Sequence, residues 1–215
     1  MTTAHPLAAI LTAAAAGRYP PPDGATDVLP QDAGGTIAVV AFTGHAYVLA
    51  DADPGEVAKR APAGGFGAAL KPELLQWLAG ERREVGSIDV VLVRRGTGHV
   101  APNDALTSDH DDHARVRRAR AHRRDVEVLA NDDGAVILGR GLVDRRELSV
   151  ELFDTESSPN GAGRALIAAG LAHVPAGEWC WAQVAPGNAR SLRAFLACGF
   201  VPIGSEVLIT AAEDR

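Results

Sequence analysis

The clearest alternation of apolar and polar positions lies in the last third of the chain. Residues 147–152 alternate between the two kinds, which predicts a strand over 147–153. The polar run 154–160 cannot continue that strand. After Gly161, apolar residues recur at helical spacing, at Ala162, Ala165, Leu166, Ala169 and Ala172. The segment WCWAQV, residues 179–184, predicts a second strand, and a strand–helix–strand unit of this length implies a parallel pair.

A second helix is predicted directly after this unit. Pro186 and Gly187 end the strand, and Asn188 can cap a helix over 189–198. The apolar stripe of that helix consists of Leu192, Phe195 and Leu196. Gly199 is a natural stop before a last strand.

The first hundred residues carry an α/β set of their own. The predicted elements are a helix over 7–16, a hairpin of 36–42 with 45–51, a short helix from Asp53 and Pro54, a helix over 71–79 and a strand over 87–95. We therefore expect an N-terminal α/β region over 1–98, a linker over 99–107 and a second domain over 108–215. An alternative is that the N-terminal region is a degenerate half-copy of the second domain, although no repeated motif supports it.

The second domain begins with a charged helix over 108–125, followed by a hairpin across 131–134. Acidic residues in the first turn of this helix suit the helix dipole. His110 and His113 lie among them, but their spacing matches no zinc pattern, so we favour a solvated helix start and expect no metal. Six arginines follow all round the helix: Arg115, Arg117, Arg118, Arg120, Arg123 and Arg124. A solvated or domain-bridging helix is favoured over a nucleic-acid contact.

Composition narrows the class of protein. The chain has 215 residues, of which 47% are hydrophobic and 22% charged, as in a globular protein. A net charge of −6 argues against general nucleic-acid binding. No apolar run approaches the ~20 residues of a membrane span, so we expect a cytoplasmic protein with no membrane contact. Cys180 and Cys198 fall in predicted buried elements and are expected to be free thiols.

The start of the first helix after the polar turn is a candidate anion site. A helix N-terminus carries partial positive charge and unpaired N–H donors, and Gly161 and Gly163 leave those donors uncovered. Arg164 adds a mobile positive charge. The alternative is that the glycines only allow a tight turn and close packing of the helix on the sheet. The stretch is neither a Rossmann fingerprint nor a Walker A loop.

Two motifs in this region resemble the GCN5-related N-acetyltransferases. The family pattern Gln/Arg-x-x-Gly-x-Gly/Ala is similar to Ser158, Gly161 and Gly163, with Ser158 in place of Gln or Arg. The later family pattern Asn-x-x-Ser/Ala-x-x-x-Tyr-x-x-x-Gly-Phe is matched with Phe in place of Tyr, at Asn188, Ser191, Phe195, Gly199 and Phe200. The resemblance covers roughly residues 108–209.

The resemblance implies an α/β fold with a mixed, mostly antiparallel central sheet, a splayed parallel strand pair and flanking helices. It implies acetyl-CoA as co-substrate, with the pyrophosphate bound by Ser158, Asn160, Gly161, Ala162, Gly163 and Arg164. The backbone of the strand at Val150, Leu152 and Phe153 would bind the pantetheine arm. Asn188, Ser191 and Phe195 would complete the site, although a phenyl ring at Phe195 cannot protonate the leaving thiolate.

The activity implied is transfer of an acetyl group to a primary amine, either of a small molecule or of a protein. The amine must lose a proton before it attacks, so a base or a water relay is needed. Glu151, on the strand, is the candidate base, and Glu206, in the last strand, is the reserve. An alternative for Glu151 is a solvated strand residue. An alternative for the whole protein is a non-catalytic acyl-CoA-binding module, and a monomer or homodimer is expected.

Overall fold

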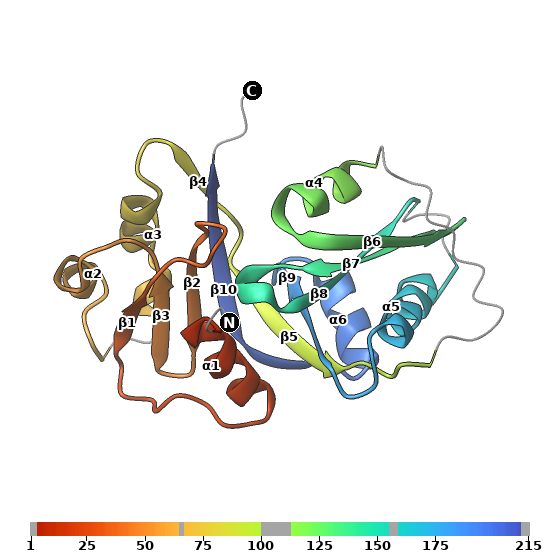
Figure 1. The fold of residues 1–215 in the computed structure, drawn as a ribbon, viewed down its shortest axis with the longest axis horizontal. Coiled ribbons are helices and arrows are strands. Elements are labelled where there is room, and N and C mark those ends of the chain that lie inside the picture. The colour runs from red at the N-terminus through yellow and green to blue at the C-terminus, as the bar shows by residue number, and fades with distance from the viewer. Residues whose placement is uncertain (1–3, 65–66, 100–112, 155–158, 212–215) are drawn as a thin grey trace. The chain divides into compact units, whose positions relative to one another are not determined.

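The chain forms two compact units in the computed structural model (Figure 1). The described residues are 4–64, 67–99, 113–154 and 159–211. The first unit combines Met1–Val91 with Ile203–Arg215, and the second contains Leu92–Pro202. The chain passes from one unit to the other within two strands, β5 (Asp89–Arg95) and β10 (Val201–Ala211).

The first unit is built from the two ends of the chain. Besides most of β10, it contains α1 (Pro6–Ala15), β1 (Thr26–Leu29), β2 (Ile37–Phe42), β3 (His45–Leu49), α2 (Pro54–Arg60), the 3₁₀ turn η1 (Ala68–Leu70), α3 (Pro72–Ala79) and β4 (Arg83–Val85). Its strands lie in the order β1-β3-β2-β10, and β4 also pairs with β10. All of these pairs are antiparallel except β1 with β3.

The local sequence explains the elements of this unit. The predicted hairpin is confirmed, with Val39 opposite Val48 across β2 and β3. The predicted cap of α2 is also confirmed, because an Asp53 side-chain oxygen accepts a hydrogen bond from the Glu56 N–H at 3.0 Å. The core is formed by one face of β2, β3 and β10 together with α3, where Val207 and Leu74 are fully buried.

The second unit carries the motifs singled out in the sequence. Its elements are α4 (Ala114–His122), β6 (Arg124–Asn131), β7 (Gly134–Arg140), the 3₁₀ turn η2 (Leu142–Asp144), β8 (Arg146–Leu152), α5 (Ala162–His173), β9 (Trp179–Val184) and α6 (Ala189–Ala197). Strands β6, β7 and β8 are antiparallel neighbours, and β8 is parallel to β9. The strand–helix–strand unit predicted from the sequence is therefore confirmed.

Helices cover both faces of β7 in this unit (Figure 1). α4 contributes Val116 and Ala119 to a buried cluster with Ala135 and Ile137. α5 packs on the opposite face, where Gly170 lies against Val136. The predicted fold class is confirmed as a mixed α/β fold with a mostly antiparallel sheet flanked by helices.

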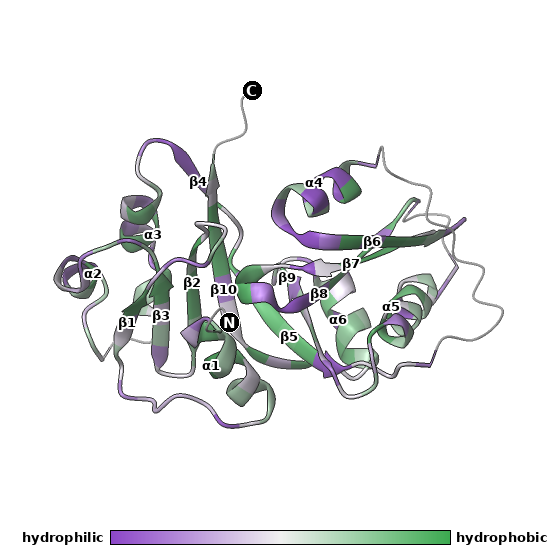
Figure 2. Ribbon diagram, viewed as in Figure 1, coloured by the Kyte–Doolittle hydropathy of each residue, from purple (hydrophilic) through white to green (hydrophobic). Residues whose placement is uncertain are grey.

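The arginine-rich helix α4 is anchored by a narrow apolar strip. In Figure 2 it is coloured mainly as hydrophilic, and its buried residues are Val116 and Ala119. The side chains of its arginines are exposed. This arrangement is that of a solvated surface helix, one of the two favoured alternatives, although Arg123, directly after the helix, is only 13% exposed. No helix within the described ranges has both the length and the apolar character that crossing a membrane requires.

The structure divides the chain at other points than the expected boundaries at 98 and 108. Most of the last strand, β10, joins the first unit, where Val207 and Ile209 supply part of the core. Strands β1 and β4, with four and three residues, were not predicted because they are too short to show a period. Almost all of the expected linker, and the start of the expected helix over 108–125, lie outside the described residues.

Candidate functional site

Helix α5 begins with two backbone donors that lack an acceptor among the described residues. Gly161 precedes the helix in the left-handed conformation, with φ of 102°. The Ala162 N–H donates to the Pro159 carbonyl at 3.1 Å, and the Ala165 N–H donates to the Gly161 carbonyl at 2.9 Å. Between them, the N–H groups of Gly163 and Arg164 have no acceptor in the described part of the chain. Such donors at a helix N-terminus favour an anion.

The two glycines at this turn have different reasons to be there. Gly161 needs its positive φ, which other residues adopt at a cost. A Cβ on Gly163 would meet no atom within 4 Å, so packing does not require glycine at that position. Close packing of α5 on the sheet occurs instead at Gly170, where a Cβ would lie 2.5 Å from Val136 Cγ2. The packing alternative therefore does not account for Gly163.

Arg164 brings a positive charge to the same helix start. A Cβ built on Gly161 would lie 3.4 Å from Arg164 Nη2, so the guanidinium folds back over the turn. The helix dipole and this guanidinium together make the turn electropositive. Asn160 lies in the turn itself, whereas Ser158 lies outside the described residues.

The strands on either side of α5 pair over a very short distance. Glu147 opposite Trp181 is the single residue pair in the parallel ladder of β8 with β9. β8 continues to Leu152 and stays paired with β7 along its whole length. Beyond the Glu147–Trp181 pair, its edge on the β9 side is not part of a ladder among the described residues. Val150 and Leu152 in this segment are half-buried and Phe153 is exposed at 36%.

The second motif folds as a capped helix with one buried aromatic residue. The Asn188 side-chain oxygen accepts a hydrogen bond from the Ser191 N–H at 3.1 Å, which is the N-cap interaction of α6. Asn188 itself is exposed. Phe195 is 5% exposed and packs edge-to-face on Phe200, with ring centroids 5.0 Å apart. Asn188 is therefore the N-cap of α6, and Phe195 is a residue of the core.

The two candidate bases have contrasting surroundings. Glu151 lies on β8 and forms an ion pair with Arg115 of α4, with 2.9 Å between Oε2 and Nε. Its side chain is 32% exposed, so solvent and ligands can reach it. Glu206 belongs to the first unit, pairs in register with Val40 and is only 1% exposed. Of the two, Glu151 shares the second unit with the α5 turn.

A buried ionic cluster on the same strand as Glu151 was not predicted. Glu147 is 5% exposed, and its carboxylate accepts from Arg145 Nε and Arg123 Nε, each at 2.8 Å. Burial by itself raises the pKa of Glu147, but the guanidinium groups of Arg145 and Arg123 outweigh it and hold the pKa below its usual value. Arg123 also donates to the Ser149 hydroxyl at 3.1 Å.

The turn between β7 and β8 positions this cluster. Val143 and Asp144 adopt positive φ values of 47° and 66°, which are uncommon for residues other than glycine. Gly141 lies so close to Glu147 that a Cβ would be 2.3 Å from its Cδ. The Gly141 N–H donates to the Arg145 carbonyl at 3.0 Å. Gly141 is the only feature of the sequence that points to this close approach of the turn to Glu147.

Neither cysteine is suited to act as a thiolate. Cys180 is buried on β9, and burial raises its pKa to about 12. Cys198, at the end of α6, also has its pKa raised by burial. Both are free thiols, as predicted.

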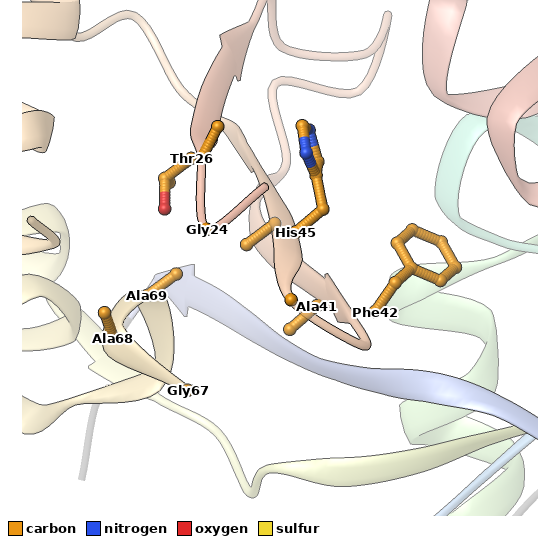
Figure 3. Close-up of a pocket in the computed structure, with 11 residues that line it drawn as sticks. Gly24, Thr26, Ala41, Phe42, His45, Gly67, Ala68 and Ala69 are labelled. Carbon is orange, nitrogen blue, oxygen red and sulfur yellow. The ribbon is translucent and has the colours of Figure 1, made fainter. Parts of the chain in front are cut away.

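The first unit has a small hollow that is open to solvent and lined mainly by small residues (Figure 3). Ala68 and Ala69 border it, and the imidazole of His45 points away from them. That imidazole is held by Asp23, with 2.9 Å between Nδ1 and Oδ1, and lies 3.4 Å from Asp27. The hollow therefore has few polar side chains with which to orient a ligand.

The fold and the α5 turn together define an α/β protein with a candidate anion site at a helix start. No protein-family model matches the chain, and no curated protein matches its sequence. A solved structure, a GCN5-related N-acetyltransferase from Kribbella flavida, is similar to it with 14% identity and a TM-score of 0.40. The similarity covers 66% of this chain and 65% of that one, slightly less than two thirds of its length.

Proposed function

We propose that the second unit binds acetyl-CoA and that the chain transfers its acetyl group to a primary amine. The observation that carries the proposal is the parallel pair of β8 and β9. The two strands share one residue pair, and the helix between them begins with two unpaired backbone donors. An extended, amide-containing arm can hydrogen-bond along an unpaired strand edge, and a pyrophosphate can accept from the helix start.

The residues available fit acetyl-CoA in three places. The N–H groups of Gly163 and Arg164, with the Arg164 guanidinium, suit the pyrophosphate. The backbone of Val150 and Leu152 suits the two amides of the pantetheine arm. The Asn188 oxygen is already used as a cap, so this residue would contribute to the site through its amide N–H₂ group.

The proposed reaction is a direct acyl transfer. The neutral amine attacks the acetyl carbon, the C–S bond breaks, a base takes the proton lost by the nitrogen, and the CoA thiolate takes a proton from water. The raised pKa values of Cys180 and Cys198 favour this direct route over an acyl-cysteine intermediate. Phe195 has no proton to give, so the thiolate would be protonated by water.

Glu151 is the proposed base that receives the amine proton. It is the better placed candidate, because it lies on β8 and is partly exposed, whereas Glu206 is fully buried in the first unit. Its ion pair with Arg115 has to loosen or rearrange as the proton arrives. Replacement of Glu151 by Gln is expected to lower turnover about 10²-fold or more and to spare the affinity for acetyl-CoA.

A non-catalytic acyl-CoA-binding module is the second candidate function. Phe195 favours it, because its ring is part of the core and has no proton to give to a leaving thiolate. The two functions share the binding site and differ only in turnover.

The test is a calorimetric titration with acetyl-CoA, followed by measurement of thiol release with a panel of primary amines. Binding with thiol release supports the transferase, and binding without release on a broad panel supports the module. Glu151→Gln is compared with a matched control, Glu127→Gln, at an exposed strand residue. A loss of turnover in Glu151→Gln alone indicates loss of the base, whereas an equal loss in both variants indicates a general effect of charge. The absence of binding up to millimolar acetyl-CoA would contradict both functions.

A further inference from the structure

A buried hydrogen-bond donor lies where β8 and β9 meet. Trp181 is 6% exposed, and its indole Nε1 is buried without a hydrogen-bond partner among the described residues. Trp181 is the residue of β9 that pairs with Glu147 of β8. Buried polar groups nearly always have a partner, so an unpaired indole N–H needs an explanation.

The position of Trp181 is special because the two strands pair only there. Residues paired in register point to the same face of a sheet, so the indole lies on the face that carries the Glu147 carboxylate. That carboxylate accepts from Arg123 and Arg145, and the indole N–H makes no bond to it. The indole N–H is therefore an unused hydrogen-bond donor at the one place where β8 and β9 pair, next to the part of β8 that is unpaired on its β9 side.

The length of the pantetheine arm would place the thioester near Glu147, the residue of β8 that pairs with Trp181. The arm has about twelve bonds between the pyrophosphate oxygen and the sulfur, which corresponds to about four extended residues. With the pyrophosphate at the α5 turn, beyond the end of β8 at Leu152, four residues back along the strand is Leu148. Leu148 is next to Glu147, the partner of Trp181.

We propose that the Trp181 indole N–H donates a hydrogen bond to the carbonyl oxygen of the acetyl thioester, which makes it a catalytic residue. This inference rests on the proposed binding of acetyl-CoA. When the amine attacks, the carbonyl bond opens and negative charge develops on that oxygen. A donor already fixed in a site shielded from water stabilises this charge without reorganisation. Collapse of the adduct restores the carbonyl as the C–S bond breaks.

The test is NMR of the indole N–H groups in the full chain. The sequence has three tryptophans, and the variants Trp77→Phe and Trp179→Phe assign two resonances, leaving the third to Trp181. Acetyl-CoA is expected to shift the Trp181 proton resonance downfield, and CoA without the acetyl group is expected not to. If both ligands bind and the Trp181 resonance is the same with each, the inference is wrong and the binding proposal stands. If neither ligand binds, the proposed function fails as well.

Affinity measurements with matched variants provide a second readout. Trp181→Phe is expected to weaken acetyl-CoA binding about 2- to 10-fold and to leave CoA binding unchanged, as for the loss of one hydrogen bond. Trp179→Phe is the control, since Trp179 lies on the same strand and is stacked by Arg95, 3.8 Å from its ring centroid. An equal effect of Trp181→Phe on both ligands would overturn the inference.

Discussion

Two glutamates on one face of β8 show how much a residue depends on its neighbours. Glu147 is buried between Arg123 and Arg145, whereas Glu151 is 32% exposed and pairs with Arg115. In the sequence both are polar positions of the same alternating strand. The burial of Glu147 could not be predicted, because it depends on arginines brought by the end of α4 and by the turn after β7.

Replacing Glu147 by Gln should destabilise the protein strongly. The variant leaves Arg123 and Arg145 buried without their counter-charge, which is expected to cost about 3–5 kcal/mol of unfolding free energy at neutral pH. Glu151→Gln removes a partly exposed pair and is expected to cost less than about 1 kcal/mol. Urea denaturation of both variants measures the difference, and equal losses would contradict the buried cluster.

The loss of unfolding free energy caused by Glu147→Gln should become smaller as the pH falls. The pKa of Glu147 is lowered in the folded protein, so its contribution is complete above the ordinary carboxyl pKa of about 4.3. It is lost as the pH falls through the lower folded value, where the protonated side chain resembles Gln. The stability gap between wild type and variant should therefore be largest near pH 7 and shrink below about pH 4. A gap that widens in acid would contradict the assignment.

At the scale of elements, helix α5 packs closely on the sheet near its end and leaves its first turn uncovered. Gly170 is pressed against Val136 and Leu148, and Gly163 faces open space. The sequence predicted the helix and its glycine-rich start from apolar spacing, and it predicted the parallel pair from the order of elements. It could not say which glycine serves packing, because that depends on the side chains of β7 and β8 across from the helix.

Two alanine substitutions in α5 should therefore have opposite effects. Gly170→Ala overpacks the sheet contact, and after the gain in helix propensity we expect a net loss of about 1–2 kcal/mol in stability. Gly163→Ala meets no atom and should raise stability by up to about 1 kcal/mol. The resembled pattern accepts either Gly or Ala at the position of Gly163, so Gly163→Ala is expected to spare acetyl-CoA binding, as is Gly170→Ala. Thermal unfolding and calorimetry on the pair check both effects.

At the scale of the molecule, the two ends of the chain fold together. β10 pairs with β2 and β4 and places Val207 and Ile209 in the core of the first unit. The sequence suggested that the last strand belongs to the second domain, because it follows α6 directly and the resemblance continues through it. The partners of a terminal strand are decided by long-range pairing, and the local alternation of apolar and polar residues carries no information on them.

Ile209→Ala should weaken the first unit selectively. The side chain is 2% exposed, so its truncation is expected to cost about 2–5 kcal/mol. Native-state hydrogen exchange should show the amides of β2 losing protection more than those of α5. The matched control is Leu166→Ala, buried at 2% exposure in α5, which should show the reverse. Equal deprotection of both units by either variant would contradict the division into two units.

The most direct test of the account is a hydrogen-exchange map of the chain with and without acetyl-CoA. Bound acetyl-CoA is expected to give new protection at two places in the second unit, at Val150 and Leu152 of β8 and at Gly163 and Arg164 of α5. The β9-facing edge of β8 beyond Glu147 belongs to no ladder among the described residues, and the N–H groups of Gly163 and Arg164 have no acceptor there. Protection confined to the first unit, or no change at saturating acetyl-CoA, would contradict the proposed site.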